Sequence, residues 1–73
     1  MLNVAMLGAS GRMGRTLVPL IAASDDLRLS GALAAAQDAS IGHDAGVLAN
    51  GAALAVAVSS DPGRALEGAD VAI

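Results

Sequence analysis

Three evenly spaced glycines form the clearest chemical signal in this sequence. Gly8, Gly11 and Gly14 stand three residues apart, with Arg12 and Arg15 beside them. The first glycine can take backbone angles denied to other residues, the second leaves the backbone amides open to a phosphate, and the third lets a helix pack closely on a strand. A helix that begins here adds unpaired N–H groups and a partial positive charge. This G-x-x-G-x-x-G spacing is a variant of G-x-G-x-x-G and predicts a dinucleotide-binding turn, with a purely structural turn as the alternative.

The second half of that pattern is missing from its usual place. A carboxylate about 20 residues beyond the turn normally binds the ribose hydroxyls. Here Ala34 and Ala35 stand at that point, and no arginine is present there to hold a 2′-phosphate. Asp38 lies a little further on and is either a substitute for the acid or a solvated loop aspartate. Position 34 carries an alanine, so no carboxylate is present there to repel a 2′-phosphate. We therefore expect NADPH to be accepted at least as well as NADH.

The remaining polar residues offer little further chemistry. His43 and Asp44 form a candidate proton-transfer pair, with a plain polar loop pair as the alternative. One histidine and no cysteine leave no set of metal ligands and exclude thiolate chemistry and disulfides, so no metal site is predicted. Four arginines, no lysine and seven carboxylates give a net charge of −3, which argues against nucleic-acid binding.

The glycine turn needs a strand before it and a helix after it, and both are readable. Leu2–Leu7 is a nearly continuous apolar run, which is typical of a buried parallel strand. The helix is predicted over Arg12–Ala23 despite Pro19, which removes one backbone hydrogen bond. Helical spacing gives it a buried face of Met13, Leu17, and Leu20 or Ile21. Met6 and Met13 are expected to fill gaps in the core.

The rest of the chain repeats the alternation of strands and helices. A loop with one helical turn is expected over Gln37–Gly51, and a helix capped by Asp61 begins at Pro62. Alternation of this kind predicts an α/β fold, here a Rossmann-like parallel sheet forming an incomplete dinucleotide-binding domain. The three further predicted strands are Leu27–Leu33, interrupted by Gly31, then Leu54–Val58 and Ala69–Ile73.

Length and composition set the scale of the fold. Seventy-three residues make one small domain at most, because so short a chain buries only about 60% of its unfolded surface. Hydrophobic residues make up 55% of the chain but include no Phe, Tyr or Trp, so the core must be built from aliphatic side chains and alanine. No apolar run approaches the ~18 residues of a membrane span, and no basic signal peptide begins the chain, so we expect a cytoplasmic protein without a membrane partner.

Three segments together resemble one enzyme family. The segments are the run Val4–Arg15, the stretch Ile41–Gly46, which resembles the family's G-x-D-A-G loop, and Ala69–Ile73, which resembles the strand leading into the family's D-F-T motif. The family is that of the bacterial dihydrodipicolinate reductases, also called 4-hydroxy-tetrahydrodipicolinate reductases. The resemblance implies a two-domain, homo-oligomeric (tetrameric) enzyme of lysine (diaminopimelate) biosynthesis that reduces a cyclic imine-type substrate with NADPH or NADH. By residue match, the cofactor-binding residues it implies are Gly8, Ala9, Ser10, Gly11, Arg12 and Met13.

The resemblance also marks what these residues lack. Ala34 and Ala35 depart from the acid, often followed by arginine, that the family commonly carries there. The family's catalytic histidine and lysine belong to a distal H-H-x-x-K region that is not among these residues, so no catalytic residue is predicted. Residues 1–73 are therefore expected to form the N-terminal part of a dinucleotide-binding domain, with the catalytic domain outside this chain. A stand-alone NAD(H)-sensing regulatory module is the alternative.

Overall fold

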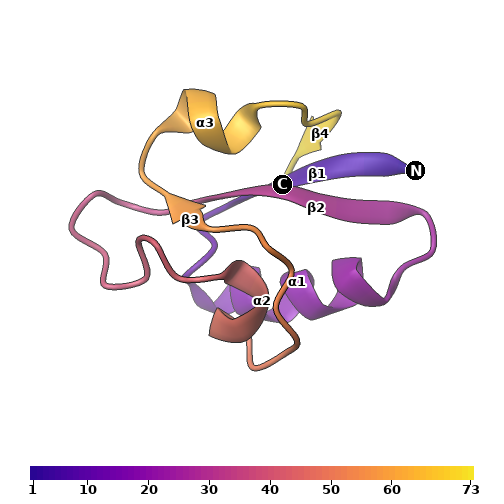
Figure 1. The fold of residues 1–73 in the computed structure, drawn as a ribbon, viewed down its shortest axis with the longest axis horizontal. Coiled ribbons are helices and arrows are strands. Elements are labelled where there is room, and N and C mark those ends of the chain that lie inside the picture. The colour runs from indigo at the N-terminus through magenta and orange to yellow at the C-terminus, as the bar shows by residue number, and fades with distance from the viewer.

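Strands and helices alternate along the whole chain, and the computed structural model describes all residues from 1 to 73 (Figure 1). The three helices all begin where the sequence predicts a helix or a helical turn, and all four strands lie within or beside the predicted ones. The elements are β1 (Leu2–Leu7), α1 (Arg12–Ala23), β2 (Leu27–Leu33), α2 (Ala45–Leu48), β3 (Val58–Ser59), α3 (Pro62–Leu66) and β4 (Val71–Ala72).

The four strands form one parallel sheet in the order β3-β2-β1-β4. Helices α1 and α2 lie on one face of this sheet and α3 lies on the other (Figure 1). The order reverses at β1, which pairs with β2 on one side and β4 on the other. Sheets of this type bind ligands beyond the carboxyl ends of the strands near such a reversal. The architecture confirms the predicted α/β, Rossmann-like fold and places the glycine turn, which follows β1, at that edge.

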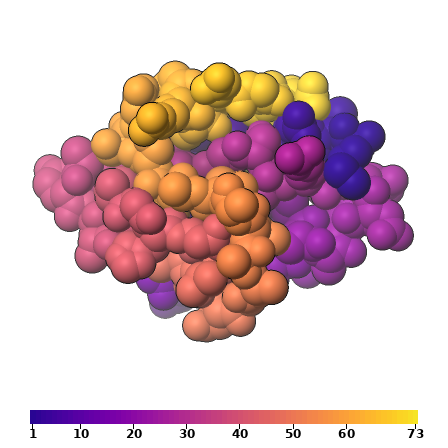
Figure 2. Space-filling view, viewed as in Figure 1, coloured from indigo at the N-terminus to yellow at the C-terminus, as the bar shows by residue number.

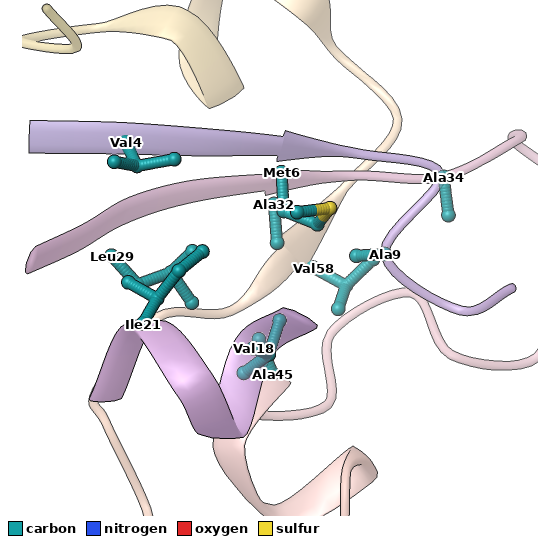
Figure 3. Close-up of a cluster of buried hydrophobic side chains, with 10 residues drawn as sticks. All are labelled: Val4, Met6, Ala9, Val18, Ile21, Leu29, Ala32, Ala34, Ala45 and Val58. Carbon is teal, nitrogen blue, oxygen red and sulfur yellow. The ribbon is translucent and has the colours of Figure 1, made fainter. Parts of the chain in front are cut away.

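The core is small and aliphatic, as the composition predicts. Its largest fully buried side chains are Met6, Val4, Val18 and Val58. In Figure 3 these side chains fill the space between the sheet and α1, and Ala9 and Ala34 close it at the carboxyl ends of β1 and β2. The core therefore reaches the glycine turn itself.

The buried face of α1 agrees with the prediction at Leu17 and Ile21 but not at Met13. Gly14, Val18 and Ile21 are buried, whereas Met13 is 68% exposed and Leu20 is 62% exposed. The prediction that Met13 fills a core gap was therefore wrong. A Cβ at position 14 would lie 2.6 Å from the carbonyl oxygen of Gly8, so only glycine permits this approach to the turn. Because Gly14 must face the strand, the buried stripe continues at positions four and seven residues further along.

The predicted strand Leu54–Val58 is the second correction, since β3 contains only Val58 and Ser59. The amides of Leu54 and Val56 donate to the side chain of Asp44 instead of to a neighbouring strand. Ala55 has a φ of 60°, which interrupts the extended backbone. The large side chains of this run still alternate towards the core, and that alternation is the pattern that suggested a strand.

The opposite face of the sheet is packed even more closely. A Cβ at Gly31 would overlap the carbonyl oxygen of Ala65, so the glycine that interrupts β2 is the residue on which α3 sits. The pairing of β1 with β2 shifts by one residue at this point, leaving Ser30 as a bulge. At the far edge, β4 is extended by hydrogen bonds between Leu7 and Ile73 and between Ile73 and Ala5. No helix is long and apolar enough to cross a membrane.

Candidate nucleotide-binding site

The glycine turn connects β1 to α1 through a left-handed residue, Gly8, and an extended one, Gly11. Gly8 has a φ of +66°, in the left-handed region that disfavours side chains. Gly11 precedes the helix with an extended backbone, and a Cβ there would stand 3.3 Å from the carbonyl oxygen of Gly8. The amide of Ala9 donates to the carbonyl of Leu33 at 2.9 Å, which ties the turn to the end of β2. Gly8 is thus required by its conformation and Gly14 by its packing against the turn, whereas a side chain at Gly11 would meet only the Gly8 carbonyl oxygen.

The amides of this turn are left without partners inside the protein. Gly11 caps α1 with no side-chain hydrogen bond, and the first turn of the helix contains no acidic residue. The backbone N–H groups of Ser10, Arg12, Met13 and Gly14 donate to no group of the chain, whereas that of Arg15 begins the helical ladder by donating to Gly11. Unpaired N–H groups at a helix N-terminus form a ready site for an anionic oxygen. The residues present therefore fit a pyrophosphate.

The structure brings three polar side chains together beside this turn. The Ser10 hydroxyl donates to Oδ2 of Asp38 at 2.8 Å, and Nε of Arg15 donates to the Ser10 carbonyl at 3.0 Å. The amide of Ser40 donates to the other carboxylate oxygen, Oδ1, at 2.8 Å. Hydrogen bonds from Ser40 and Ser10, with the positive charge of Arg15 nearby, hold the pKa of Asp38 below its ordinary value of 3.8. Asp38 is therefore an ionised carboxylate fixed to the glycine turn.

The other predicted site residues have different surroundings. The side chain of Ala9 is buried in the core, so only its backbone faces the turn. Arg12 and Met13 are exposed on the first turn of α1 and contribute free amides, and the guanidinium of Arg12 makes no hydrogen bond within the chain. His43 lines the same hollow as Arg15 and Asp38.

The candidate proton-transfer pair of His43 and Asp44 is not supported by the geometry. Both oxygens of Asp44 are occupied by backbone amides, those of Gly46, Val47 and Leu54 on Oδ2 and that of Val56 on Oδ1. These bonds, led by the one from Leu54, hold the pKa of Asp44 below its ordinary value. The carboxylate therefore anchors a loop, and no cluster of three metal-ligating side chains exists in the structure.

Comparison with known proteins agrees with this geometry. A family model described as "Dihydrodipicolinate reductase, N-terminus" matches residues 2–73. The chain belongs to this family. Membership confirms the resemblance drawn from the glycine turn and, with it, the expected cofactor class of NADPH or NADH. The assignment of single residues to the cofactor stays a prediction.

Curated relatives carry the same enzyme name. The 4-hydroxy-tetrahydrodipicolinate reductase of Anaeromyxobacter dehalogenans (strain 2CP-1) is 49% identical over 73 residues, which are 100% of this chain and 27% of that protein. The Nitrosomonas europaea reductase is 46% identical over 72 residues, or 99% of this chain and 26% of that protein. The Geotalea daltonii reductase is 41% identical over 73 residues, covering 100% and 27%. The chain thus spans about a quarter of the length of these relatives.

Proposed function

We propose that residues 1–73 supply the nucleotide-binding part of an NADPH- or NADH-dependent reductase that reduces 4-hydroxy-tetrahydrodipicolinate in lysine (diaminopimelate) biosynthesis. The observation that carries this proposal is the set of unpaired amides of Ser10, Arg12, Met13 and Gly14. They point to an anionic ligand because each unpaired N–H at a helix N-terminus favours negative charge. Family membership supports the nucleotide of a reductase as that ligand.

In this proposal the chain binds and orients but does not carry out the reaction. The backbone of Gly8–Met13 holds the pyrophosphate, and the absence of a side chain at Gly11 leaves room for it. The charges of Arg12 and Arg15 add attraction in front of the turn. A bound nicotinamide nucleotide supplies the hydride, and the groups that bind the substrate and deliver a proton lie outside residues 1–73.

The wider context of the protein follows from the same family. We propose a two-domain enzyme in which residues 1–73 are the N-terminal part of the dinucleotide-binding domain, assembled as a homo-oligomer and acting in the cytoplasm. The relatives described above are reductases by name, which favours this function over a stand-alone NAD(H)-sensing module.

Replacing the central glycine tests the proposal. In the intact protein that contains residues 1–73, Gly11→Val should abolish binding of NADPH and NADH, because the new side chain stands where a pyrophosphate meets the amides. Titration followed by nicotinamide fluorescence measures the two dissociation constants. Gly51→Val is the matched control, since Gly51 lies in a loop away from the turn and a Cβ there makes an ordinary 3.4 Å contact. Unchanged affinity in Gly11→Val would remove the glycine turn from the binding site.

A further inference from the structure

The Asp38 carboxylate stands at the junction where a ribose must lie if the glycine turn holds the pyrophosphate. Ribose is joined to its phosphate through a single methylene group, so it cannot lie far from the amides of the turn. The acid of the usual fingerprint reaches the ribose from the end of β2. Ala34 ends β2 in this chain, but the next segment folds back and brings Asp38 within 2.8 Å of the Ser10 hydroxyl, inside the turn itself.

The Asp38 carboxylate also has acceptor capacity to spare. An ionised carboxylate offers about four lone-pair sites. Two are filled here, one by the Ser10 hydroxyl and one by the Ser40 amide. By contrast, Asp44 already accepts from four backbone amides. Asp38 can therefore accept hydrogen bonds from two vicinal hydroxyl groups without giving up either of the bonds that hold it.

A buried hydroxyl beside this carboxylate points to the same place. Ser40 is only 5% exposed, and its hydroxyl has no hydrogen-bond partner of acceptable geometry. Ser40, Asp38 and Arg15 line one hollow at the surface, beside the turn. Buried polar groups in proteins are nearly always paired, so this hydroxyl and the half-filled carboxylate leave hydrogen-bonding capacity unused at one place beside the turn.

We propose that Asp38 takes the place of the missing acid, binds the 2′- and 3′-hydroxyls of the adenosine ribose, and makes this protein prefer NADH to NADPH. The inference rests on the proposed function and adds its cofactor preference. A 2′-phosphate would bring negative charge against an ionised carboxylate that Ser10 and Ser40 hold in place. The positive charge of Arg15 attracts a 2′-phosphate only weakly, because the Asp38 carboxylate nearby already compensates that charge. The preference is the opposite of the one expected from Ala34 alone.

The test separates the adenosine half of the nucleotide from the rest. In the intact protein, ADP and 2′,5′-ADP compete against NADH fluorescence, and the ratio of their inhibition constants reports the ribose site. We expect ADP to bind about tenfold or more tightly than 2′,5′-ADP in the wild type. Asp38→Asn should remove this difference by weakening ADP and strengthening 2′,5′-ADP. Asp25→Asn, an exposed aspartate with no side-chain hydrogen bond, should leave the ratio unchanged.

Ser10→Ala is a second test in case the Asp38→Asn variant does not fold. It removes the hydroxyl that orients the Asp38 carboxylate and leaves the loop backbone intact. It should shift the ratio in the same direction by a smaller factor. A wild type that prefers 2′,5′-ADP, or an Asp38→Asn variant that weakens both fragments equally, would overturn the inference. In either case nucleotides still bind, so the proposed function survives. A wild type that binds neither fragment nor NADH would instead overturn the proposed function, and this inference with it.

Discussion

The N-termini of α1 and α2 are built in opposite ways. At α2, the Asp44 carboxylate accepts from the amides of Gly46 and Val47, so the end of the helix is closed by the protein itself. At α1, Gly11 offers no side chain, the first turn carries no acid, and the first amides stay free. An uncapped helix end is less stable than a capped one. α1 is also the longest helix, and its end faces the edge of the sheet where ligands of this fold class bind.

The contrast shows how to separate a structural end from a functional one. The hydrogen bonds of Asp44, in the G-x-D-A-G loop, hold one segment of the fold in place. This segment, coloured pink to orange, lies on the face of the molecule towards the viewer in Figure 2. The glycine turn leaves its hydrogen-bonding capacity unused, and this capacity is what a ligand can fill. Exchanging the features of the two ends is therefore the most direct way to test the comparison.

The largest effect is expected when α1 is given the cap that α2 has. Gly11→Asp places a carboxylate where it can accept from the amides of Met13 and Gly14, and its φ of −76° suits an aspartate. Nucleotide affinity should fall by about a hundredfold or more, because the amides are occupied and a like charge faces the pyrophosphate. The melting temperature should stay the same or rise slightly.

Fluorescence titration and thermal unfolding, measured on the same sample, check both halves of this prediction. Gly11→Asn is the matched variant, because it caps the amides without adding charge and should weaken binding less. Retained affinity in Gly11→Asp would mean that the free amides are not part of the binding site.

A second, smaller effect is expected at the closed end. Asp44→Asn keeps the shape of the side chain but replaces one acceptor oxygen by a donor, so either the amide of Val56 or the amides bound to Oδ2 lose their partner. The melting temperature should drop by several degrees, while the ratio of NADH to NADPH affinity stays at its wild-type value. Asp25→Asn is the control. If Asp44→Asn melts at the same temperature as this control, the Asp44 hydrogen bonds do not stabilise the loop.

The same carboxylate should make the protein sensitive to acid. The pKa of Asp44 is lower in the folded state than its ordinary value of 3.8, so the stability it contributes is present above that pH. This contribution is lost as the pH falls below 3.8 and through the folded-state pKa. The loss of stability on the acid side should therefore be shallower in Asp44→Asn, as urea unfolding at a series of pH values can measure.

The sequence predicts this fold well where local patterns decide it and less well where distant residues meet. The strand before the glycine turn, the bounds of α1 and the Asp61 cap follow from hydrophobic spacing and capping chemistry. The inward face of α1 does not, since it depends on how closely Gly14 approaches a carbonyl oxygen six residues earlier.

Two long-range contacts explain the other differences. The segment Leu54–Val58 alternates like a strand, but Asp44, ten residues before Leu54, takes its amides. Asp38 looks like an ordinary loop residue by its position after β2, and only the return of that loop to Ser10 brings it to the turn. No propensity or spacing rule encodes these pairings. The position of Asp38 shortly after the missing acid is the sequence signal that made it a candidate substitute.

The smallest effect is expected at α3, whose side-chain cap makes fewer hydrogen bonds than the cap of α2. Oδ1 of Asp61 accepts a single bond, from the amide of Gly63 at 3.0 Å, and Pro62 already fixes the first turn without needing a donor. Asp61→Ala should therefore reduce the free energy of unfolding by only about 0.5–1 kcal/mol, the lower part of the range for a lost N-cap. Because α3 lies on the face of the sheet opposite α1, nucleotide affinity should not change. Urea unfolding of the Asp61→Ala and Asp44→Asn variants shows which substitution lowers the free energy of unfolding more. A loss at α3 equal to that at α2 would show that one cap bond matters as much as four, and that the number of amides on a carboxylate does not measure its structural role.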